Sequence, residues 1–393
     1  MAKQKIIVQK FGGTSVATAE RRKKVIGHIK RALDEGFRVV AVVSAIGRRG
    51  APYATDTLLD LLKAEDPIIH GRDYDFIFQA GEIISVAVMS HILKRNGIPA
   101  VAMTGAQAGI QTDGYYRRAK IVNIDTTRLY RHIGKGEVPV VTGGQGISEE
   151  GDVNILGRGA SDTSGVALGV ALDAEKVEIY TDVPGVAKAD PRVVSKVSFL
   201  EVISYTKLYE MGRYGAKVVH PGAVLLGKEN GIPILCRSTF DEGMGTLITE
   251  TKDEPPLVGI PSLGPVELLI IREESIDNAN IEELYERLGV VTINDEASGK
   301  LILAIASGWR QELEEILSMK EVLPLEVLSD QSLVSLIGST DFIEQSFPRV
   351  ECILAELDIK GSFKERTDLR STFTVPHAKS SRLVSALYDA FVA

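Results

Sequence analysis

A lysine followed by two adjacent glycines is the first indication of chemistry in this sequence. Lys10, Phe11, Gly12 and Gly13 come directly after a short apolar run. Adjacent glycines let backbone N–H groups approach phosphate oxygens closely, and a lysine adds a point charge that can follow a phosphoryl group during transfer. The segment therefore predicts a phosphate site, although a tight turn with a solvated lysine explains the same residues equally well. It is neither a Walker A loop nor a GxGxxG fingerprint.

The elements around this segment indicate how it is positioned. A predicted strand at Lys5–Val8 precedes it, and Ala19–Leu33 follows with apolar residues at helical spacing. The alternation continues with strands at Arg38–Val43, Val138–Thr142 and Val177–Thr181 and a helix at Asp162–Leu172. This order predicts an α/β fold, a three-layer arrangement in which helices cover both faces of a mostly parallel sheet. Ligands of such sheets bind at the carboxyl ends of the strands, where the glycine-rich motifs lie.

A proline-rich break separates this region from the rest of the chain. Residues 251–265 hold four prolines, so we interpret them as a linker. After the linker, strand and helix patterns repeat a β-α-β-β-α-β order twice, which is typical of ferredoxin-like units. The predicted domains are therefore a first domain at 1–250, the linker, and two small α+β domains at 266–325 and 326–393.

Composition argues against several other classes of protein. The chain has 393 residues, 25% of them charged, and a formal net charge of −8, which fits a soluble globular protein and argues against nucleic acid as a partner. No apolar run approaches the ~20 residues that span a bilayer, and the N-terminus lacks a signal-peptide layout. We therefore expect no membrane partner and a cytoplasmic location. The two cysteines lie far apart and the six histidines show no metal-ligand spacing, so we predict neither a disulfide framework nor a metal site.

A series of motifs resembles those of aspartate kinases, within the amino acid kinase superfamily. In chain order they are Lys10–Ser15, Val42–Ala45, Gly81-Glu82, Leu156–Thr163, Tyr180–Val183, Ala189–Arg192 and Gly215–Pro221. One such match has little weight, but the whole series in the family's order over the first 250 residues is specific. The resemblance implies that 1–250 is an amino acid kinase catalytic domain that uses ATP.

The resemblance also assigns roles at the phosphate end of the site. Phosphoryl transfer spreads charge over the equatorial oxygens, so the protein must supply positive charge. The family's pattern implies that Lys10 stabilises the transferred group, that Lys217 lies near the nucleotide and that Asp162 orients the lysines. Taken alone, Asp162 is more simply a helix-capping carboxylate. The other residues expected to contact ATP are Gly12, Gly13, Thr181, Asp182, Asp190 and Arg192. Mg²⁺ is expected to bridge the phosphates, with no protein ligand assigned.

The nature of the acceptor explains why no general base is obvious. A side-chain carboxylate has a pKa near ~4 and is already ionised at neutral pH, whereas a hydroxyl acceptor more often needs a base. An amino-acid acceptor needs an arginine fork for its α-carboxylate and a carboxylate for its α-ammonium; the resemblance places Arg158 and Glu82 in these roles. Ser44 and Ser161 are expected to donate further hydrogen bonds. The resemblance thus implies phosphorylation of L-aspartate to 4-phospho-L-aspartate, the first step of lysine, threonine and methionine (diaminopimelate) biosynthesis.

The chain departs from the family's pattern beside the expected acceptor. Gly144 stands where the family commonly has an aromatic residue, Ala160 where it commonly has glycine, and Asn154-Ile155 where it often has threonines. Loss of the aromatic wall predicts a looser pocket and weaker aspartate affinity. Ala160 adds a methyl group to a tight turn, which requires a negative φ. These changes do not touch the charged residues, so we expect activity to be kept.

The two C-terminal units resemble by position the paired ACT domains of aspartate kinases, which bind amino-acid effectors and build dimers. The resemblance therefore implies a homodimer formed through these units. The family's glycine-containing effector loop is not recognisable after the first strand of either unit, where Arg272–Asn278 and Ser339–Phe342 stand instead. Feedback control by lysine, threonine or diaminopimelate and a purely structural pair of dimerisation domains are thus both open.

Two other functions also remain open from the sequence. The changes at Gly144 and Ala160 fit a regulator that binds ligand with little turnover, against which the retained Lys10 and Arg158 argue. The second is an amino acid kinase with another acceptor, such as glutamate, carbamate or a nucleotide. The pair of Glu82 and Arg158 favours an acceptor with both an ammonium and a carboxylate group, which carbamate and nucleoside monophosphates lack.

Overall fold

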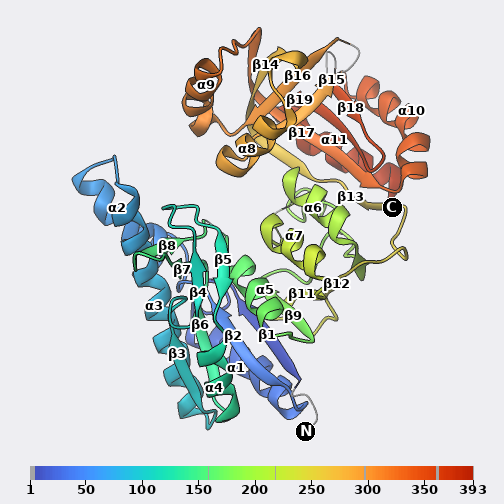
Figure 1. Ribbon diagram of the computed structural model, residues 1–393. Coiled ribbons are helices and arrows are strands. Elements are labelled where there is room, and N and C mark those ends of the chain that lie inside the picture. The colour runs from blue at the N-terminus through green and yellow to red at the C-terminus, as the bar shows by residue number, and fades with distance from the viewer. Residues whose placement is uncertain (1–4, 158, 217, 296–297, 360–362, 393) are drawn as a thin grey trace. The chain divides into compact units, whose positions relative to one another are not determined.

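The computed structural model describes residues 5–157, 159–216, 218–295, 298–359 and 363–392 (Figure 1). The chain divides into two compact units. Unit 1 comprises Met1–Val186 and Val218–Glu250, and unit 2 comprises Ala187–Lys217 and Thr251–Ala393. The predicted first domain at 1–250 therefore differs from unit 1 by residues 187–217, which pack with the C-terminal part of the chain.

Unit 1 is built on a mostly parallel sheet. Its strands run in the order β12-β11-β9-β1-β2-β6-β3, and only β12 is antiparallel to its neighbour β11. The bounds are β1 Ile6–Phe11, β2 Arg38–Val43, β3 Ala100–Met103, β6 Val138–Thr142, β9 Lys176–Thr181, β11 Ile234–Ser238 and β12 Thr246–Ile248. Strands β1 and β2 are buried along almost their whole length, as expected for parallel strands that helices cover on both faces. The predicted parallel α/β sheet is thus confirmed.

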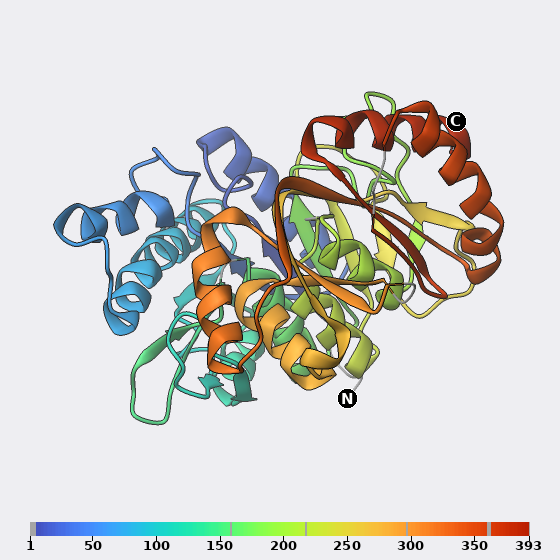
Figure 2. The same ribbon diagram turned by 90° about the horizontal axis from the view of Figure 1, so that it is seen from above.

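Helices cover both faces of this sheet. The helices of the unit are α1 Ala19–Asp34, α2 Thr55–Glu65, α3 Gly71–Arg95, α4 Thr127–Gly134, α5 Ser161–Ala171 and α7 Pro221–Asn230. Helix α2 packs against α3 rather than on the sheet (Figure 1 and Figure 2). Apolar residues of α1 and α3 form one core with alternate residues of β1, β2 and β6. On the other face α5 lies so close to β1 that a Cβ at Gly165 would stand 3.3 Å from the Cβ of Lys10. A small sheet, β5-β4-β7-β8, completes the unit with β4 Ile110–Thr112, β5 Ile121–Ile124, β7 Gln145–Ile147 and β8 Val153–Ile155.

Helix α3 is long and apolar enough, by length and composition alone, to cross a membrane. Half of its most apolar stretch is buried inside the protein. The buried positions also include polar side chains, among them Asp75, Gln79 and Glu82. Because this helix contributes to the core beneath the sheet, we interpret it as the core helix of unit 1.

Unit 2 contains one continuous antiparallel sheet in the order β15-β16-β14-β17-β19-β18, with β13 paired to β17. The strands are β13 Leu257–Gly259, β14 Ser262–Arg272, β15 Val291–Asp295, β16 Lys300–Ile305, β17 Glu326–Gly338, β18 Lys364–Arg366 and β19 Arg370–Pro376; β10 Val202–Ile203 lies earlier in the chain. The helices are α6 Tyr205–Arg213, α8 Asn278–Leu288, α9 Arg310–Met319, α10 Thr340–Glu356 and α11 His377–Phe391, with 3₁₀ turns at Glu273–Ser275 and Ser307–Trp309.

The order β-α-β-β-α occurs twice in unit 2, which matches the predicted β-α-β-β-α-β order except that neither repeat has a final strand of its own among the described residues. The two repeats are not separate sheets, because β14 and β17 pair along most of their length. The stretch predicted as a linker, 251–265, also differs from the prediction, since it contains β13 and the first residues of β14. The predicted division at 325/326 falls directly before β17, within this shared sheet.

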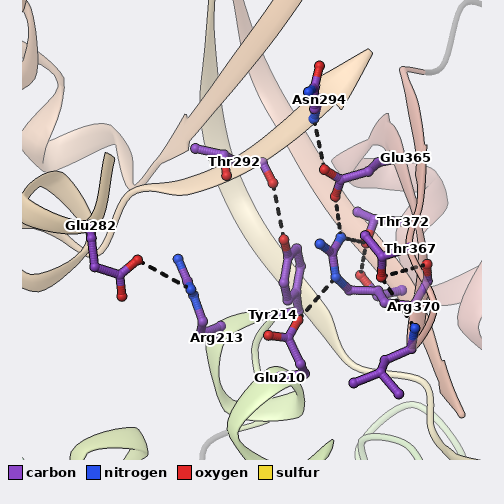
Figure 3. A network of polar contacts seen from close by, with 12 residues as sticks. Glu210, Arg213, Tyr214, Glu282, Thr292, Asn294, Glu365, Thr367, Arg370 and Thr372 are labelled. Carbon is purple, nitrogen blue, oxygen red and sulfur yellow. Dashed lines mark hydrogen bonds and ion pairs between the residues drawn. The ribbon is translucent and has the colours of Figure 1, made fainter. Parts of the chain in front are cut away.

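A buried polar network ties α6 to both repeats (Figure 3). Arg370 on β19 is only 7% exposed and makes ion pairs with Glu210 on α6, at 3.2 Å, and with Glu365 on β18, at 2.5 Å. Its guanidinium carbon lies 4.0 Å from the ring centre of Tyr214. The Tyr214 hydroxyl donates to the carbonyl of Thr292 on β15 at 3.1 Å. These contacts explain why residues 187–217 belong to unit 2.

Candidate active site

A pocket of about 480 Å³ lies in unit 1 at the carboxyl ends of β1 and β2. Five of the predicted site residues line it: Lys10, Gly13, Ser44, Glu82 and Ser161. The remaining lining residues are Ala45, Gly47, Arg48, Arg49, Ala54, Thr55, Asp56, Phe78, Gly144, Gly157 and Gly159. The pocket thus lies where parallel α/β sheets bind their ligands.

The paired glycines hold two loops in close contact at the floor of the pocket. A Cβ added at Gly13 would stand 2.6 Å from the carbonyl oxygen of Ala45, so this position requires glycine. The carbonyl of Gly13 accepts a hydrogen bond from the N–H of Gly47 at 3.2 Å, and the N–H of Gly12 donates to the carbonyl of Tyr180 at 3.3 Å. The glycines therefore bring the loop after β1 against the loop after β2 and against the end of β9.

Lys10 and Asp162 form the central ion pair of the site. Their Nζ and Oδ1 atoms are 2.6 Å apart, and both side chains are mostly buried, at 12% and 9% exposed. The other carboxylate oxygen of Asp162 accepts a hydrogen bond from the backbone N–H of His220 at 3.1 Å. Asp162 lies in the first turn of α5, where the helix dipole favours a carboxylate. It is therefore held from two sides and fixes the position of the Lys10 ammonium group.

Glu82 is a buried carboxyl group with spare hydrogen-bonding capacity. It lies on α3, is 3% exposed, and its Oε2 has no hydrogen-bond partner among the described residues. Burial raises the pKa of Glu82 to about 8, because the N–H of Ala45 and the charge of Lys10 offset only part of the desolvation. In the ligand-free pocket Glu82 is therefore protonated at neutral pH. A cation placed against Oε2 would lower this pKa and restore the carboxylate.

Small residues form another part of the pocket lining, among them Ser44, Gly144 and Ser161. The hydroxyl of Ser44 donates to that of Ser161 at 3.0 Å, and a Cβ at Gly143 would stand 2.6 Å from the Ser161 hydroxyl. Gly144 has φ +71°, a conformation that an aromatic residue rarely adopts. Ala160 has φ −71°, so the condition under which its methyl group is tolerated is met.

Thr181 is the last residue of β9, the neighbour of β1 in the sheet, and Asp182 follows it. Asp182 accepts a hydrogen bond from Thr181 at 3.3 Å and forms an ion pair with Arg48 at 3.0 Å. Because Arg48 also lines the pocket, it connects this predicted nucleotide region to the phosphate loops.

The structure does not test the predicted ligand contacts of four other residues. Arg158 and Lys217 lie outside the described residues. Asp190 and Arg192 belong to unit 2, where they pair with each other at 2.6 Å. The predicted contacts of these four residues with aspartate or ATP stay predictions.

Sequence reasoning missed several residues that the pocket brings together. Arg48 and Arg49 follow Gly47 directly after the second strand, so two adjacent arginines at a strand end were a usable signal. His220 lies in the motif Gly215–Pro221 but was assigned no role of its own, because it acts on Asp162 through its backbone N–H. Among the residues that the structure describes, no three histidine, cysteine, aspartate or glutamate side chains cluster as metal ligands do.

Comparisons with known proteins agree with this geometry. Residues 5–238 match the model of the amino acid kinase family. Aspartokinase 1 of Bacillus subtilis (strain 168) is 48% identical over 245 residues, an alignment that covers 62% of this chain and 61% of that protein, so the match spans about three fifths of the relative's length. Aspartokinase 2 of the same organism is 33% identical over 403 residues, covering 98% of this chain and 97% of that protein.

Solved structures show the same fold over the whole chain. The crystal structure of E. coli aspartokinase III in complex with aspartate and ADP superposes with a TM-score of 0.81 at 23% identity, covering 99% of this chain and 100% of that chain. The same enzyme in complex with lysine and aspartate gives a TM-score of 0.71 at 22% identity and the same coverage. This likeness extends through both units.

Proposed function

Because this chain belongs to the amino acid kinase family, we propose that it transfers the γ-phosphoryl group of ATP to the side-chain carboxylate of L-aspartate. The products are 4-phospho-L-aspartate and ADP. The observation that carries the proposal is the convergence of the Lys10–Asp162 ion pair and the buried Glu82 carboxyl on one pocket. The full-length similarity to an aspartokinase supports the same acceptor.

The pocket supplies what this transfer needs. A carboxylate oxygen of aspartate forms a bond to the γ-phosphorus while the bond to the β-phosphate oxygen breaks, and no proton moves because the nucleophile is already ionised. Lys10 faces the charge that develops on the phosphoryl oxygens, and Asp162 holds it in place. Glu82 receives the α-ammonium group, while Ser44 and Ser161 are positioned to donate hydrogen bonds to the acceptor.

Mg²⁺ would supply charge neutralisation between the β- and γ-phosphates. Asp162 and Asp182 are engaged by Lys10 and Arg48, two residues that line the pocket. The described residues therefore fit an ion held mainly by ATP and water, a common arrangement for this metal.

The wider role follows from the same proposal. The product is the first intermediate on the route to threonine, to methionine and, through diaminopimelate, to lysine, and we place the reaction in the cytoplasm. Unit 2 would form a homodimer through its ACT-like repeats. E. coli aspartokinase III is known in complex with lysine, and an amino-acid effector is part of the proposal for this chain as well.

A coupled assay of ADP release tests the function. ATP should be consumed with L-aspartate and not with glutamate, carbamate or nucleoside monophosphates. Lys10→Ala should lower kcat by roughly a thousandfold or more, because it removes charge stabilisation of the transition state. Lys5→Ala is the matched control, since Lys5 is exposed and pairs only with surface Glu175 among the described contacts.

Two results would overturn the assignment. The first is the absence of aspartate-dependent ADP release from a folded protein. The second is wild-type turnover in the Lys10→Ala variant. Tight aspartate binding without turnover would instead identify a ligand-binding regulator.

A further inference from the structure

One face of helix α3 carries two residues that line the pocket and a third, Asp75, that is buried beside them on the same face. Asp75, Phe78 and Glu82 follow the i, i+3, i+7 spacing of a single helix face. Phe78 and Glu82 line the pocket. Asp75 is fully buried, at 0% exposed, and takes no part in the proposed chemistry. A buried carboxyl group beside an active site requires an explanation, because an ionised group is costly to bury unless it is well bonded.

Asp75 accepts hydrogen bonds from the backbones of two distant segments. Its two oxygens lie 2.9 Å and 3.0 Å from the N–H of Arg117. Its Oδ2 also lies 3.0 Å from the N–H of Ile155, the last residue of β8. Arg117 has φ +67°, a conformation that costs a non-glycine residue free energy and is kept only where its surroundings enforce it. Asp75 therefore fixes both a strained turn and the end of a strand.

The strand end that Asp75 holds leads directly into the pocket wall. After Ile155, the N–H of Leu156 donates to the carbonyl of Gly144 at 2.9 Å, and Gly157 and Gly159 line the pocket. The side chain of Ile155 packs against Phe78. Gly157 in the pocket lining thus comes only two residues after Ile155, whose N–H Asp75 holds.

Burial raises the pKa of Asp75 to about 6, against the opposing effect of its two N–H donors. The group is therefore ionised at neutral pH, where both oxygens accept hydrogen bonds. Alternative polar side chains do not provide the same contacts. An asparagine offers one oxygen and turns an N–H₂ group toward the second donor.

We propose that Asp75 is a positioning residue for the acceptor end of the site, because it fixes the strand end that leads to Gly157 and Gly159 in the pocket lining that they share with Glu82. The inference rests on the proposed function, because the acceptor is taken to be aspartate. It assigns Asp75 no contact with substrate. It predicts that Asp75 affects recognition of the acceptor far more than that of ATP.

Steady-state kinetics of Asp75→Ala and Asp75→Asn test the proposal. Removing the acceptor of two buried N–H groups should raise the KM for aspartate by about tenfold or more, with the KM for ATP and the kcat at saturating aspartate within about twofold. Asp75→Asn should give a smaller rise, because it keeps one acceptor. Asp113→Ala is the matched control, since Asp113 also accepts from two backbone N–H groups of this hairpin loop but is exposed.

The outcomes separate this inference from the proposed function. A wild-type protein without aspartate-dependent turnover refutes the proposed function, and aspartate binding by calorimetry then tests the pocket directly. An unchanged KM for aspartate in both variants of an active enzyme refutes only the positioning role. Equal losses in both KM values and kcat, accompanied by a lower melting temperature, also refute it, because they indicate a general structural role. If Asp75→Ala does not fold, Asp75→Asn carries the same comparison.

Discussion

Replacing Glu82 with glutamine should stabilise unit 1 and remove a pH dependence from its unfolding. In the unfolded chain a glutamate has its ordinary pKa of 4.5, whereas burial raises the pKa of Glu82 to about 8 in the folded protein. Between these values the folded state binds more protons than the unfolded state, so stability falls as pH rises. A difference of this size corresponds to at most about 5 kcal/mol above pH 8. Glutamine has no charge to desolvate and still offers an oxygen to the N–H of Ala45.

The experiment compares urea unfolding of the wild-type and Glu82→Gln proteins from pH 5.5 to pH 9. Trp309 is the chain's single tryptophan and lies in unit 2, so its fluorescence reports the unfolding of unit 2. Circular dichroism reports both units, and the transition seen only by dichroism belongs to unit 1. Asp73→Asn, on the exposed side of the same helix, is the control.

The expected result is a stability difference that grows with pH and then levels off. The difference in unfolding free energy between the Gln variant and the wild type should grow by about 3 kcal/mol from pH 5.5 to pH 8. It should change little between pH 8 and pH 9. The Asp73→Asn variant should show no such trend. Parallel pH profiles for wild type and Glu82→Gln would refute the reasoning, because they would mean that Glu82 ionises in the folded protein at its ordinary pKa.

Two further predictions follow from close contacts in each unit. Gly13→Ala should lower activity at least about a hundredfold, because its Cβ would stand 2.6 Å from the carbonyl oxygen of Ala45; Gly27→Ala, which has open space around its Cβ, should leave the ADP-release assay unchanged. Arg370→Met should lower the stability of unit 2 by about 3–5 kcal/mol, because it removes the guanidinium that pairs with the carboxylates of both Glu210 and Glu365. A shift in the urea midpoint of Trp309 fluorescence measures this loss, and an unshifted midpoint would contradict it.

The local parts of the fold were predictable from the sequence, and the long-range parts were not. Apolar periodicity placed α1 and α5 to within about one residue, since it depends only on neighbours along the chain. The segment 251–265 was interpreted as a linker because it is rich in proline. It forms strands nonetheless, and β14 accommodates Pro265 at an irregularity in its pairing with β17. A pairing partner about seventy residues away leaves no trace in a local pattern.

The candidate site shows the same limit. Lys10, Ser44, Glu82 and Ser161 were identified because their segments carry recognisable motifs, and the structure brings them to one pocket. Asp75 was missed because its partners are backbone N–H groups 42 and 80 residues away. Backbone groups have no side-chain identity, so no motif records such a contact.

The polar groups at the two ends of the pocket differ in whether they have partners within the protein. At the phosphate end, Lys10 is paired with Asp162 and the glycine loops are in contact, so this end is preformed. At the acceptor end, Glu82 retains a buried oxygen without a partner among the described residues. An α-ammonium group would both satisfy this oxygen and lower the pKa of the carboxyl, whereas an acceptor that lacks it would leave the oxygen unsatisfied. Sites that leave a buried polar group unpaired reject the deficient ligand strongly. If the proposed acceptor is right, we therefore expect the buried Glu82 oxygen to favour an amino acid over a simple dicarboxylate, because only the amino acid supplies a partner for it.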